Sequence, residues 1–474
     1  MEYTQELRRE LTKFERIVLE LAERVEGAAG QPAGFRAAVT ALRGALDQVG
    51  RAAFLTLVAR SEETADTVVD AAGTVHRFKQ AAAKDWLTLW GPVVVVRRLF
   101  QADRGGRCRV PVDEHCGMVD RYLTSELERA TAFLGAQLTP AEVEAALAEV
   151  LVQSPSRTAI QHVLARVGGC AETQAVAVEA AVAATAPLAL EADVLVVSWD
   201  GTTVPLREPA PVRGRPPERP GLPEAKVAAT AWKEAGVGMV ASYWAAGDPA
   251  SETAERVDVR YFARMPEPKM ATLIDQVAQQ TAAALAAGTF AHQVFLADGK
   301  REIWRVVGAC PVFEGFTTIV DFYHAAEHLS HAAEALFGKS TADAQHWYRR
   351  WRHKLQHQHG GVAALQRSLH YHQQRLQKGS DRWRQVTSER GYFRNNQARM
   401  DYAGYRAAGL PIGSGPVEAA CKTIVGQRLK RSGMRWTRAG GQHILNLRVP
   451  LQSKRWDAFW NWYLAHTDQL AKAA

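Results

Sequence analysis

Cysteine is scarce in this 474-residue chain, which has five cysteines spread over its length. Five scattered thiols are too few for the disulfide framework of a small secreted protein, so they favour a reducing compartment. The first residues, from Glu2 onward, are charged and lack the apolar stretch of a signal peptide. Long apolar runs are missing as well, because the alanine-rich stretch near residues 174–190 contains Glu179. We therefore expect a cytoplasmic protein that does not enter a membrane.

Acidic residues are absent from one long stretch near the C-terminus. Between Cys421 and Arg455 the chain has nine Lys or Arg residues and no Asp or Glu. A second basic segment, residues 346–399, has three tryptophans among its cationic residues. Cationic residues beside aromatic side chains suit a nucleic acid, whereas a single basic run is about as often a solvated helix face. The residues that we expect to bind DNA are Lys422, Arg428, Lys430, Arg431, Arg435, Arg438, Arg349, Arg350 and Arg352.

The remaining composition is that of a folded protein. Hydrophobic residues make up 47% of the chain and charged residues 23%, which is enough apolar surface for a sizeable core. At roughly 100–200 residues per domain, a chain of this length divides into two to four domains. Apolar residues recur every three or four positions over residues 2–65, which predicts helices for a region 1–66 and makes this region one candidate dimer interface.

The next two regions differ in their periodicity. Short β-branched runs separated by glycine predict a small β-rich unit over residues 67–117. Residues 118–190 return to helical spacing, with helix starts at Thr139-Pro140 and near Ser154-Pro155. Two short helices with a tight break suggest a helix-turn-helix whose Arg157–Arg166 helix reads DNA, although helical hairpins that bind nothing are far commoner.

From Asp193 onward, apolar runs of strand length alternate with helical patterns, which predicts an α/β sheet. Six prolines in the eighteen residues 207–224 predict a loop or disordered insertion between the first two strands. Four arginines in that segment are further candidates for contact with DNA, although a merely solvated loop is the commoner explanation. We divide this half into a first part of the core (191–337), an all-α insertion (338–400) and a last part with basic helices (401–474).

Three carboxylates fall where the predicted strands stop: Asp200, Asp298 and Asp321. In open α/β sheets, functional groups gather beyond the carboxyl ends of the strands. Two or three carboxylates there suffice for Mg²⁺, which takes oxygen ligands and keeps several waters. An Asp-Gly pair after a strand is more often a plain turn, and two of these aspartates precede glycine.

Glu418 is the fourth candidate acid. The sequence Gly-Ser-Gly-Pro before it predicts a helix start with Pro416 at the first helical position. An acidic residue in a first turn is commonly explained by the helix dipole alone. Here the predicted helix is basic from Lys422 onward, so a carboxylate that holds a metal could stand beside cations that hold phosphates.

Over residues 195–460 the chain resembles bacterial insertion-sequence transposases of the Kra type. These belong to the DDE superfamily and are distant relatives of the Mutator-like elements. The motifs that carry the resemblance are VSWDGTTVPLRE, AWKEAGVGMV, FLADGKREIW, IVDFYHAAEHL and YFRNNQARMDYAGYRAAGLPIGSGPVEAACKTIVGQRLKRSGMRW. The resemblance implies an α/β RNase H-like catalytic core with an all-α insertion, preceded by a mostly helical N-terminal region with a small β-unit.

The same resemblance implies roles for individual residues. Asp200, Asp298 and Glu418 would be the three catalytic acids and metal ligands, and Asp321 and His324 would support the site. Asp321 is the rival of Asp298 for the second place. Many relatives also carry a Cys-x-x-Cys zinc element, but Cys108 and Cys116 have no second pair, so we predict no structural zinc.

The histidines at 324, 328 and 331 have a spacing that suits metal ligands, but histidine packed beside aromatic residues needs no metal. The predicted cofactor is instead a pair of Mg²⁺ or Mn²⁺ ions, held by the three acids. The resemblance implies a DNA transposase of the bacterial nucleoid, at least a homodimer, that binds double-stranded DNA as terminal inverted repeats and as target. The alternatives are a domesticated DNA-binding regulator and a nuclease that cuts without joining. A small-molecule hydrolase has little support, because the chain has no G-x-S-x-G motif.

Overall fold

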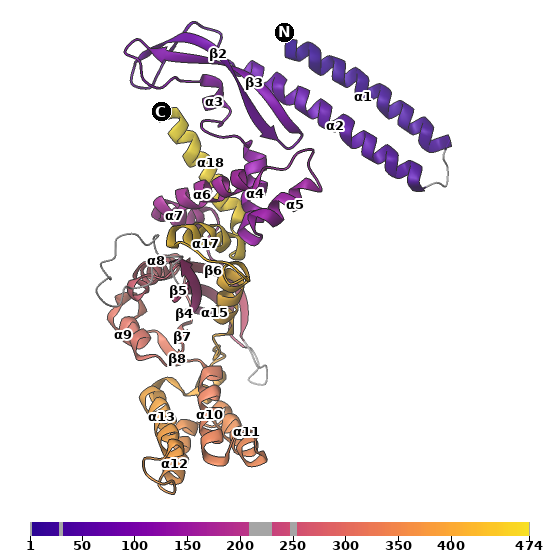
Figure 1. The fold of residues 1–474 in the computed structure, drawn as a ribbon. Coiled ribbons are helices and arrows are strands. Elements are labelled where there is room, and N and C mark those ends of the chain that lie inside the picture. Colours follow the sequence, from indigo (N-terminus) through magenta and orange to yellow (C-terminus); the bar gives the residue numbers. More distant parts are fainter. Residues whose placement is uncertain (1, 28–31, 208–229, 247–253, 474) are drawn as a thin grey trace, which may run out of the picture. The chain divides into compact units, whose positions relative to one another are not determined.

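The computed structural model describes residues 2–27, 32–207, 230–246 and 254–473 (Figure 1). The chain divides into two compact units: Met1–Ala181 with Trp456–Ala474, here called the N-terminal unit, and Val182–Arg455, here called the sheet unit. The proline-rich segment predicted as a loop lies, apart from Arg207, outside the described residues. In the described part of the chain, helices of the length and apolarity needed to cross a bilayer do not occur.

The N-terminal unit begins with two long helices, α1 (Glu2–Gly27) and α2 (Pro32–Arg60), which pack against each other. An antiparallel sheet follows, with β1 (Thr67–Val69), β2 (Val75–Thr88) and β3 (Gly91–Ala102). The run GPVVVV alternates along β3, so that Val93 and Val95 are buried while Val94 and Val96 are exposed. The helical and β-rich periodicities predicted for this part of the sequence are confirmed as secondary structure.

Five helices follow: α3 (Pro111–His115), α4 (Ser125–Gln137), α5 (Pro140–Ala148), α6 (Arg157–Thr173) and α7 (Ala175–Thr185). The last of these, α7, runs across the boundary between the two units. Helix α5 starts at the predicted Thr139, which forms a capping box with Glu142. The predicted helix-turn-helix fits poorly, because residues 149–156 connect α5 to α6, whereas such motifs use a turn of about 3–4 residues. Arg166 also binds the buried carboxylate of Glu128, so it is not available to read DNA.

The last helix, α18 (Trp456–Ala473), belongs to the N-terminal unit. It packs on α3 and α6, the Tyr463 hydroxyl donates to Glu128 at 3.0 Å, and the rings of Trp456 and Phe133 lie 5.5 Å apart. Assigning the whole of 401–474 to the last part of the core was therefore wrong for residues 456–474. The apolar face of α18 is buried by helices that precede the sheet unit in the chain.

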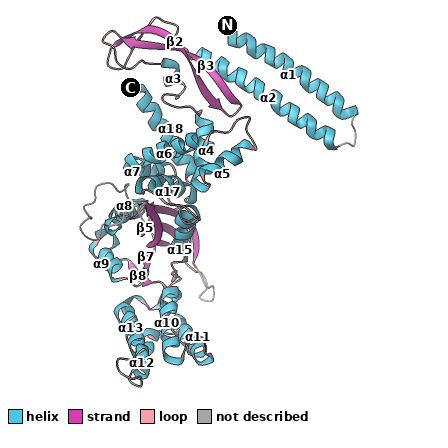
Figure 2. Cartoon of the chain, in the orientation of Figure 1, coloured by secondary structure: helices cyan, strands magenta, loops and turns pink. Residues whose placement is uncertain are grey.

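The sheet unit is built on five strands (Figure 2): β4 (Val194–Arg207), β5 (Thr230–Trp244), β6 (Glu255–Arg264), β7 (His292–Ala297) and β8 (Thr317–Val320). Their order across the sheet is β6-β5-β4-β7-β8. The first three form an antiparallel meander, and β7 and β8 are parallel to β4. Residues 194–199 are buried without interruption, as expected for a central strand covered on both faces.

Helices cover the faces of this sheet. Helix α8 (Ala271–Ala287) lies so close to β5 that a Cβ atom at Gly238 would be 2.4 Å from a methyl group of Val277. The other helices beside the strands are α9 (Arg301–Ala309), α15 (Gly415–Ala420), α16 (Gln427–Leu429) and α17 (Arg438–Gln452), with short 3₁₀ turns η1 (Pro268–Met270) and η2 (Pro311–Phe313). A π-helical turn, η4 (Cys421–Gly426), joins α15 to α16.

A group of helices is inserted between β8 and α15 (Figure 1). It contains α10 (Phe322–Phe337), α11 (Ala342–His357), α12 (Gly361–Gln373), α13 (Asp381–Asn396), η3 (Gln397–Arg399) and α14 (Tyr402–Ala407). Trp347 and Trp351, which the sequence placed beside basic residues, are buried here as core side chains. The helical character predicted for 338–400 is confirmed, but the group begins earlier, because α10 packs on α11 and α13.

Candidate active site

Three aspartates lie just beyond the paired residues of the parallel strands. In the β4–β7 pairing Val197 lies opposite Phe295, and in the β7–β8 pairing Ala297 lies opposite Val320. Continued beyond the last paired residues, this register puts Asp200 level with Asp298 and Asp298 level with Asp321. Residues level with each other on parallel strands share a face of the sheet. The acids that follow the apolar runs thus lie beyond the paired residues of the parallel strands, toward one edge of the sheet.

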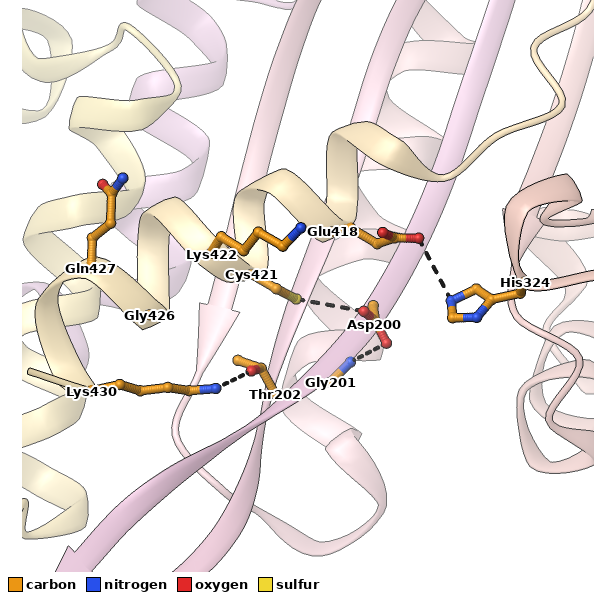
Figure 3. Close-up of a pocket in the computed structure, with 10 residues that line it drawn as sticks. All are labelled: Asp200, Gly201, Thr202, His324, Glu418, Cys421, Lys422, Gly426, Gln427 and Lys430. Atoms are coloured by element: carbon orange, nitrogen blue, oxygen red, sulfur yellow. Dashed lines mark hydrogen bonds and ion pairs between the residues drawn. The ribbon is translucent and has the colours of Figure 1, made fainter. Parts of the chain in front are cut away.

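The sequence predicted that Asp200 ends its strand, and this was wrong. Strand β4 continues to Arg207, and Asp200 is paired with Val237 of β5. Asp200 does lie beyond Val197, the last residue of β4 that pairs with β7. At Asp200 the strand therefore has a paired neighbour in β5 but not in β7. Its Oδ1 accepts the backbone N–H of Gly201 at 2.7 Å, and its Oδ2 lies 3.8 Å from the Cys421 sulfur (Figure 3). A thiol is a weak donor, so Oδ2 is held loosely.

Glu418 comes to the same place from the first turn of α15. Its Oε1 accepts the hydroxyl of Ser414 at 3.0 Å and lies 3.6 Å from Nε2 of His324. Asp200, His324 and Glu418 line one pocket with a volume of about 590 Å³ (Figure 3). The other lining residues are Gly201, Thr202, Cys421, Lys422, Gly426, Gln427 and Lys430. Two of the three predicted acids and one supporting residue are therefore brought together with two lysines.

Asp298 lies outside the lining of this pocket and interacts with Lys300. Its Oδ2 is 3.2 Å from the Lys300 ammonium, and its Oδ1 accepts the Lys300 backbone N–H at 3.0 Å. Burial opposes the charge on that ammonium, but the carboxylates of Asp298, Glu234 and Asp200 outweigh it and raise the pKa of Lys300. Lys300 therefore forms ion pairs with Asp298 and, at 3.9 Å, with Glu234 of β5. Sequence reasoning missed this lysine, although its position two residues after Asp298 was a usable signal.

Asp321 has a different environment from Asp298. Its side chain is fully buried, and it caps α10 by accepting the His324 backbone N–H at 2.9 Å. Its second oxygen accepts the backbone N–H of Ser414. Asp321 thus joins the start of α10 to the segment that leads into α15, and it holds the backbone of His324 and of Ser414, whose hydroxyl donates to Glu418. Both oxygens of Asp321 accept backbone N–H groups in a fully buried position, whereas one oxygen of Asp298 is held only by the side chain of Lys300. A side chain can move away more easily than backbone, so the geometry favours Asp298 over Asp321 as a metal ligand.

The π-turn η4 shapes the side of the pocket formed by Cys421 and Lys422. Such turns leave carbonyl groups without their usual helical partners. The buried guanidinium of Arg448 on α17 donates from Nε to the Ile424 carbonyl at 2.7 Å and from Nη2 to the Thr423 carbonyl. Burial lowers the pKa of Arg448 to about 10. Arg448 therefore supports the backbone between Glu418 and Lys430.

The predicted DNA-binding residues fall into two groups. Those with side chains open to solvent or lining the pocket are Lys422, Lys430, Arg431, Arg435, Arg349 and Arg350, and Lys430 also donates to Thr202. Arg428 was a wrong prediction, because it is 1% exposed and stacks over Trp436 with 5.3 Å between guanidinium and ring centre. Arg352 lies over the ring of Phe322, and Arg438 donates to the Pro266 carbonyl, so both are partly engaged within the fold.

Two carboxylates line the pocket, and carboxylate oxygens suit a hard divalent cation. Glu418 and Asp200 present carboxylate oxygens into the same pocket, which is large enough to hold an ion with several waters. Lys300 would have to leave Asp298 before that carboxylate could become a third ligand. The donor chemistry therefore fits Mg²⁺ or Mn²⁺.

Comparison of the sequence with models of protein families and with curated proteins finds no match.

Proposed function

We propose that this protein is a DNA transposase of the DDE type, acting on the ends of its own mobile element. The observation that carries the proposal is the meeting of Asp200 and Glu418, from distant parts of the chain, in one pocket with Lys422 and Lys430. The strand order β6-β5-β4-β7-β8, with three antiparallel strands followed by two parallel ones, supports an RNase H-like core.

The residues of the pocket have separable tasks. Asp200 and Glu418, joined by Asp298, would hold two divalent ions, which when bound supply an activated water or 3′-hydroxyl and stabilise the leaving oxygen. The ammonium groups of Lys422 and Lys430 would hold the phosphates beside the scissile bond. Ser414 and His324, both in contact with Glu418, would fix the orientation of its carboxylate.

Double-stranded DNA would continue from the pocket over the exposed cations near α16. Arg431 and Arg435 lie there at the surface, and α11 presents Arg349 and Arg350. Contacts of this kind neutralise phosphates and release counterions, so affinity should fall steeply as salt is raised. Two copies of the chain would be needed to cut both ends of one element.

A nicking assay tests the proposal. Wild-type protein with Mn²⁺ should nick a supercoiled plasmid carrying the inverted repeats that flank its gene, and should then produce strand-transfer products. Asp200→Ala and Glu418→Ala should each reduce nicking by more than about a thousandfold while leaving binding of the repeat DNA nearly unchanged. The exposed Glu314→Gln serves as the matched control and should nick normally.

Other results of this assay would favour one of the alternative functions or disprove the site. Nicking without strand-transfer products would favour a nuclease, and binding without nicking would favour a regulator. Undiminished nicking by Asp200→Ala would disprove the assignment of the site.

A further inference from the structure

A second group of metal-ligating side chains lies in the inserted helices, outside the pocket described above. His328 and His331 are three residues apart on α10, so they share one face of that helix. Glu389 reaches the same face from α13, which packs on α10. One potential ligand atom from each of these three side chains lies within 4.8 Å of the other two.

The contacts of this cluster favour a bound cation. Glu389 is 6% exposed, and a buried carboxylate is costly unless positive charge or strong hydrogen bonds offset it. Its Oε2 lies 2.6 Å from Nδ1 of His328, whose ring is stacked on Tyr392 with 3.5 Å between the ring centres. The ring of His328 is thereby fixed in direction, as second-shell packing fixes the histidine ligands of metal sites.

A simple hydrogen bond between His328 and Glu389 would explain two of the three residues. It does not involve His331, whose exposed imidazole stays beside the pair with 6.2 Å between its ring centre and that of His328. A divalent ion explains all three positions. The exposure of His331 also leaves one side of the cluster open for a water ligand.

We propose that His328, His331 and Glu389 form a binding site for Zn²⁺, with water as the fourth ligand. Two imidazoles and one carboxylate are a common zinc donor set, and imidazole ligands select against Mg²⁺ and Ca²⁺. His324, by contrast, points to Glu418, so the three histidines of α10 do not form one site. The ion would tie α13 to α10, the helix whose start holds Asp321 and His324.

The test uses the full chain in a background, Asp200→Asn with Glu418→Gln, that replaces both carboxylates lining the other pocket with neutral amides. After treatment with a chelator, this protein should bind one Zn²⁺ per chain in calorimetry, and Co²⁺ should give the visible absorption of tetrahedral coordination. Adding His331→Gln should weaken Zn²⁺ binding by at least about tenfold and abolish that absorption. Because His331 is exposed, this change should not disturb folding.

Two further variants complete the design. His353→Gln, at an exposed histidine of α11, is the matched control and should bind Zn²⁺ like the background protein. Glu389→Gln keeps the shape of the side chain but should also lose the ion. Absence of stoichiometric Zn²⁺ binding, or equal binding by His331→Gln and His353→Gln, would overturn the proposal. Because the acids of the other pocket are already removed, either result leaves the proposed transposase function untouched.

Discussion

Asp298 and Asp321 follow neighbouring strands, yet their oxygens have different partners. Asp321 accepts two backbone N–H groups in a buried position, from His324 and Ser414. Asp298 pairs with the half-exposed ammonium of Lys300. The buried hydrogen bonds of Asp321 stabilise the fold. The ammonium of Lys300, in contrast, could be replaced at Asp298 by a metal ion.

Substitution by asparagine should separate these roles. In Asp321→Asn an NH₂ group must face a backbone N–H, so we expect a loss of about 2–3 kcal/mol in the free energy of unfolding. Asp298→Asn should cost under about 1 kcal/mol, because it removes one partly exposed ion pair, but it should abolish nicking. Urea denaturation and the plasmid assay measure the two effects. If Asp321→Asn were stable but inactive and Asp298→Asn were active, Asp321 would be the metal ligand instead of Asp298.

At the residue scale, the sequence predicts which acids are candidates for the site better than it predicts the groups that contact them. Asp200, Asp298, Asp321 and Glu418 were all marked by a strand end or a helix start, since those patterns are local. The choice between Asp298 and Asp321 was not predictable, because it depends on the N–H of Ser414, 93 residues further along the chain. Burial of Arg428 likewise results from tertiary packing that a run of basic residues does not reveal.

At the scale of elements, the helical segment from α15 to α16 is interrupted by the π-turn η4. Alternation of strands and helices from residue 193 onward was predictable, because each element has its own apolar period. The π-turn was not, since it depends on Arg448 of α17 meeting the carbonyls of Thr423 and Ile424.

Arg448→Met tests this dependence. Methionine keeps much of the apolar stem but removes the Arg448 donors from both carbonyls, so we expect a loss of about 3 kcal/mol in the free energy of unfolding. Urea denaturation followed by tryptophan fluorescence measures the change. Arg435→Met, at an exposed arginine near the same segment, is the control and should stay within about 0.5 kcal/mol of wild type. Equal stability of the two variants would show that the π-turn does not need Arg448.

At the scale of the whole molecule, the chain leaves the N-terminal unit at residue 181 and returns to it at Trp456. Such a return is hard to predict from sequence, because the apolar face of α18 would pack equally well on any complementary helices. The buried contacts of Trp460 and Tyr463, together with the Tyr463–Glu128 hydrogen bond, show where it packs.

Trp460→Ala should destabilise the N-terminal unit by about 3–5 kcal/mol, because it removes a large side chain from a buried position. Hydrogen exchange should then show faster exchange of amides in α4 and α6, with β4 and β7 unchanged. The control is Trp232→Ala on β5, a tryptophan that is 59% exposed and whose loss should have little effect. Faster exchange in β4 and β7 rather than in α4 and α6 would contradict the division into units.

The central claim is that carboxylates from β4, β7 and α15 meet around divalent ions. Anomalous scattering from crystals of the full chain soaked in Mn²⁺ measures this directly. We expect a peak in the pocket about 2.0–2.3 Å from carboxylate oxygens of both Asp200 and Glu418, with Lys300 moved away from Asp298. A soaked crystal without a manganese peak at Asp200, or with the ion bound elsewhere, would contradict the account.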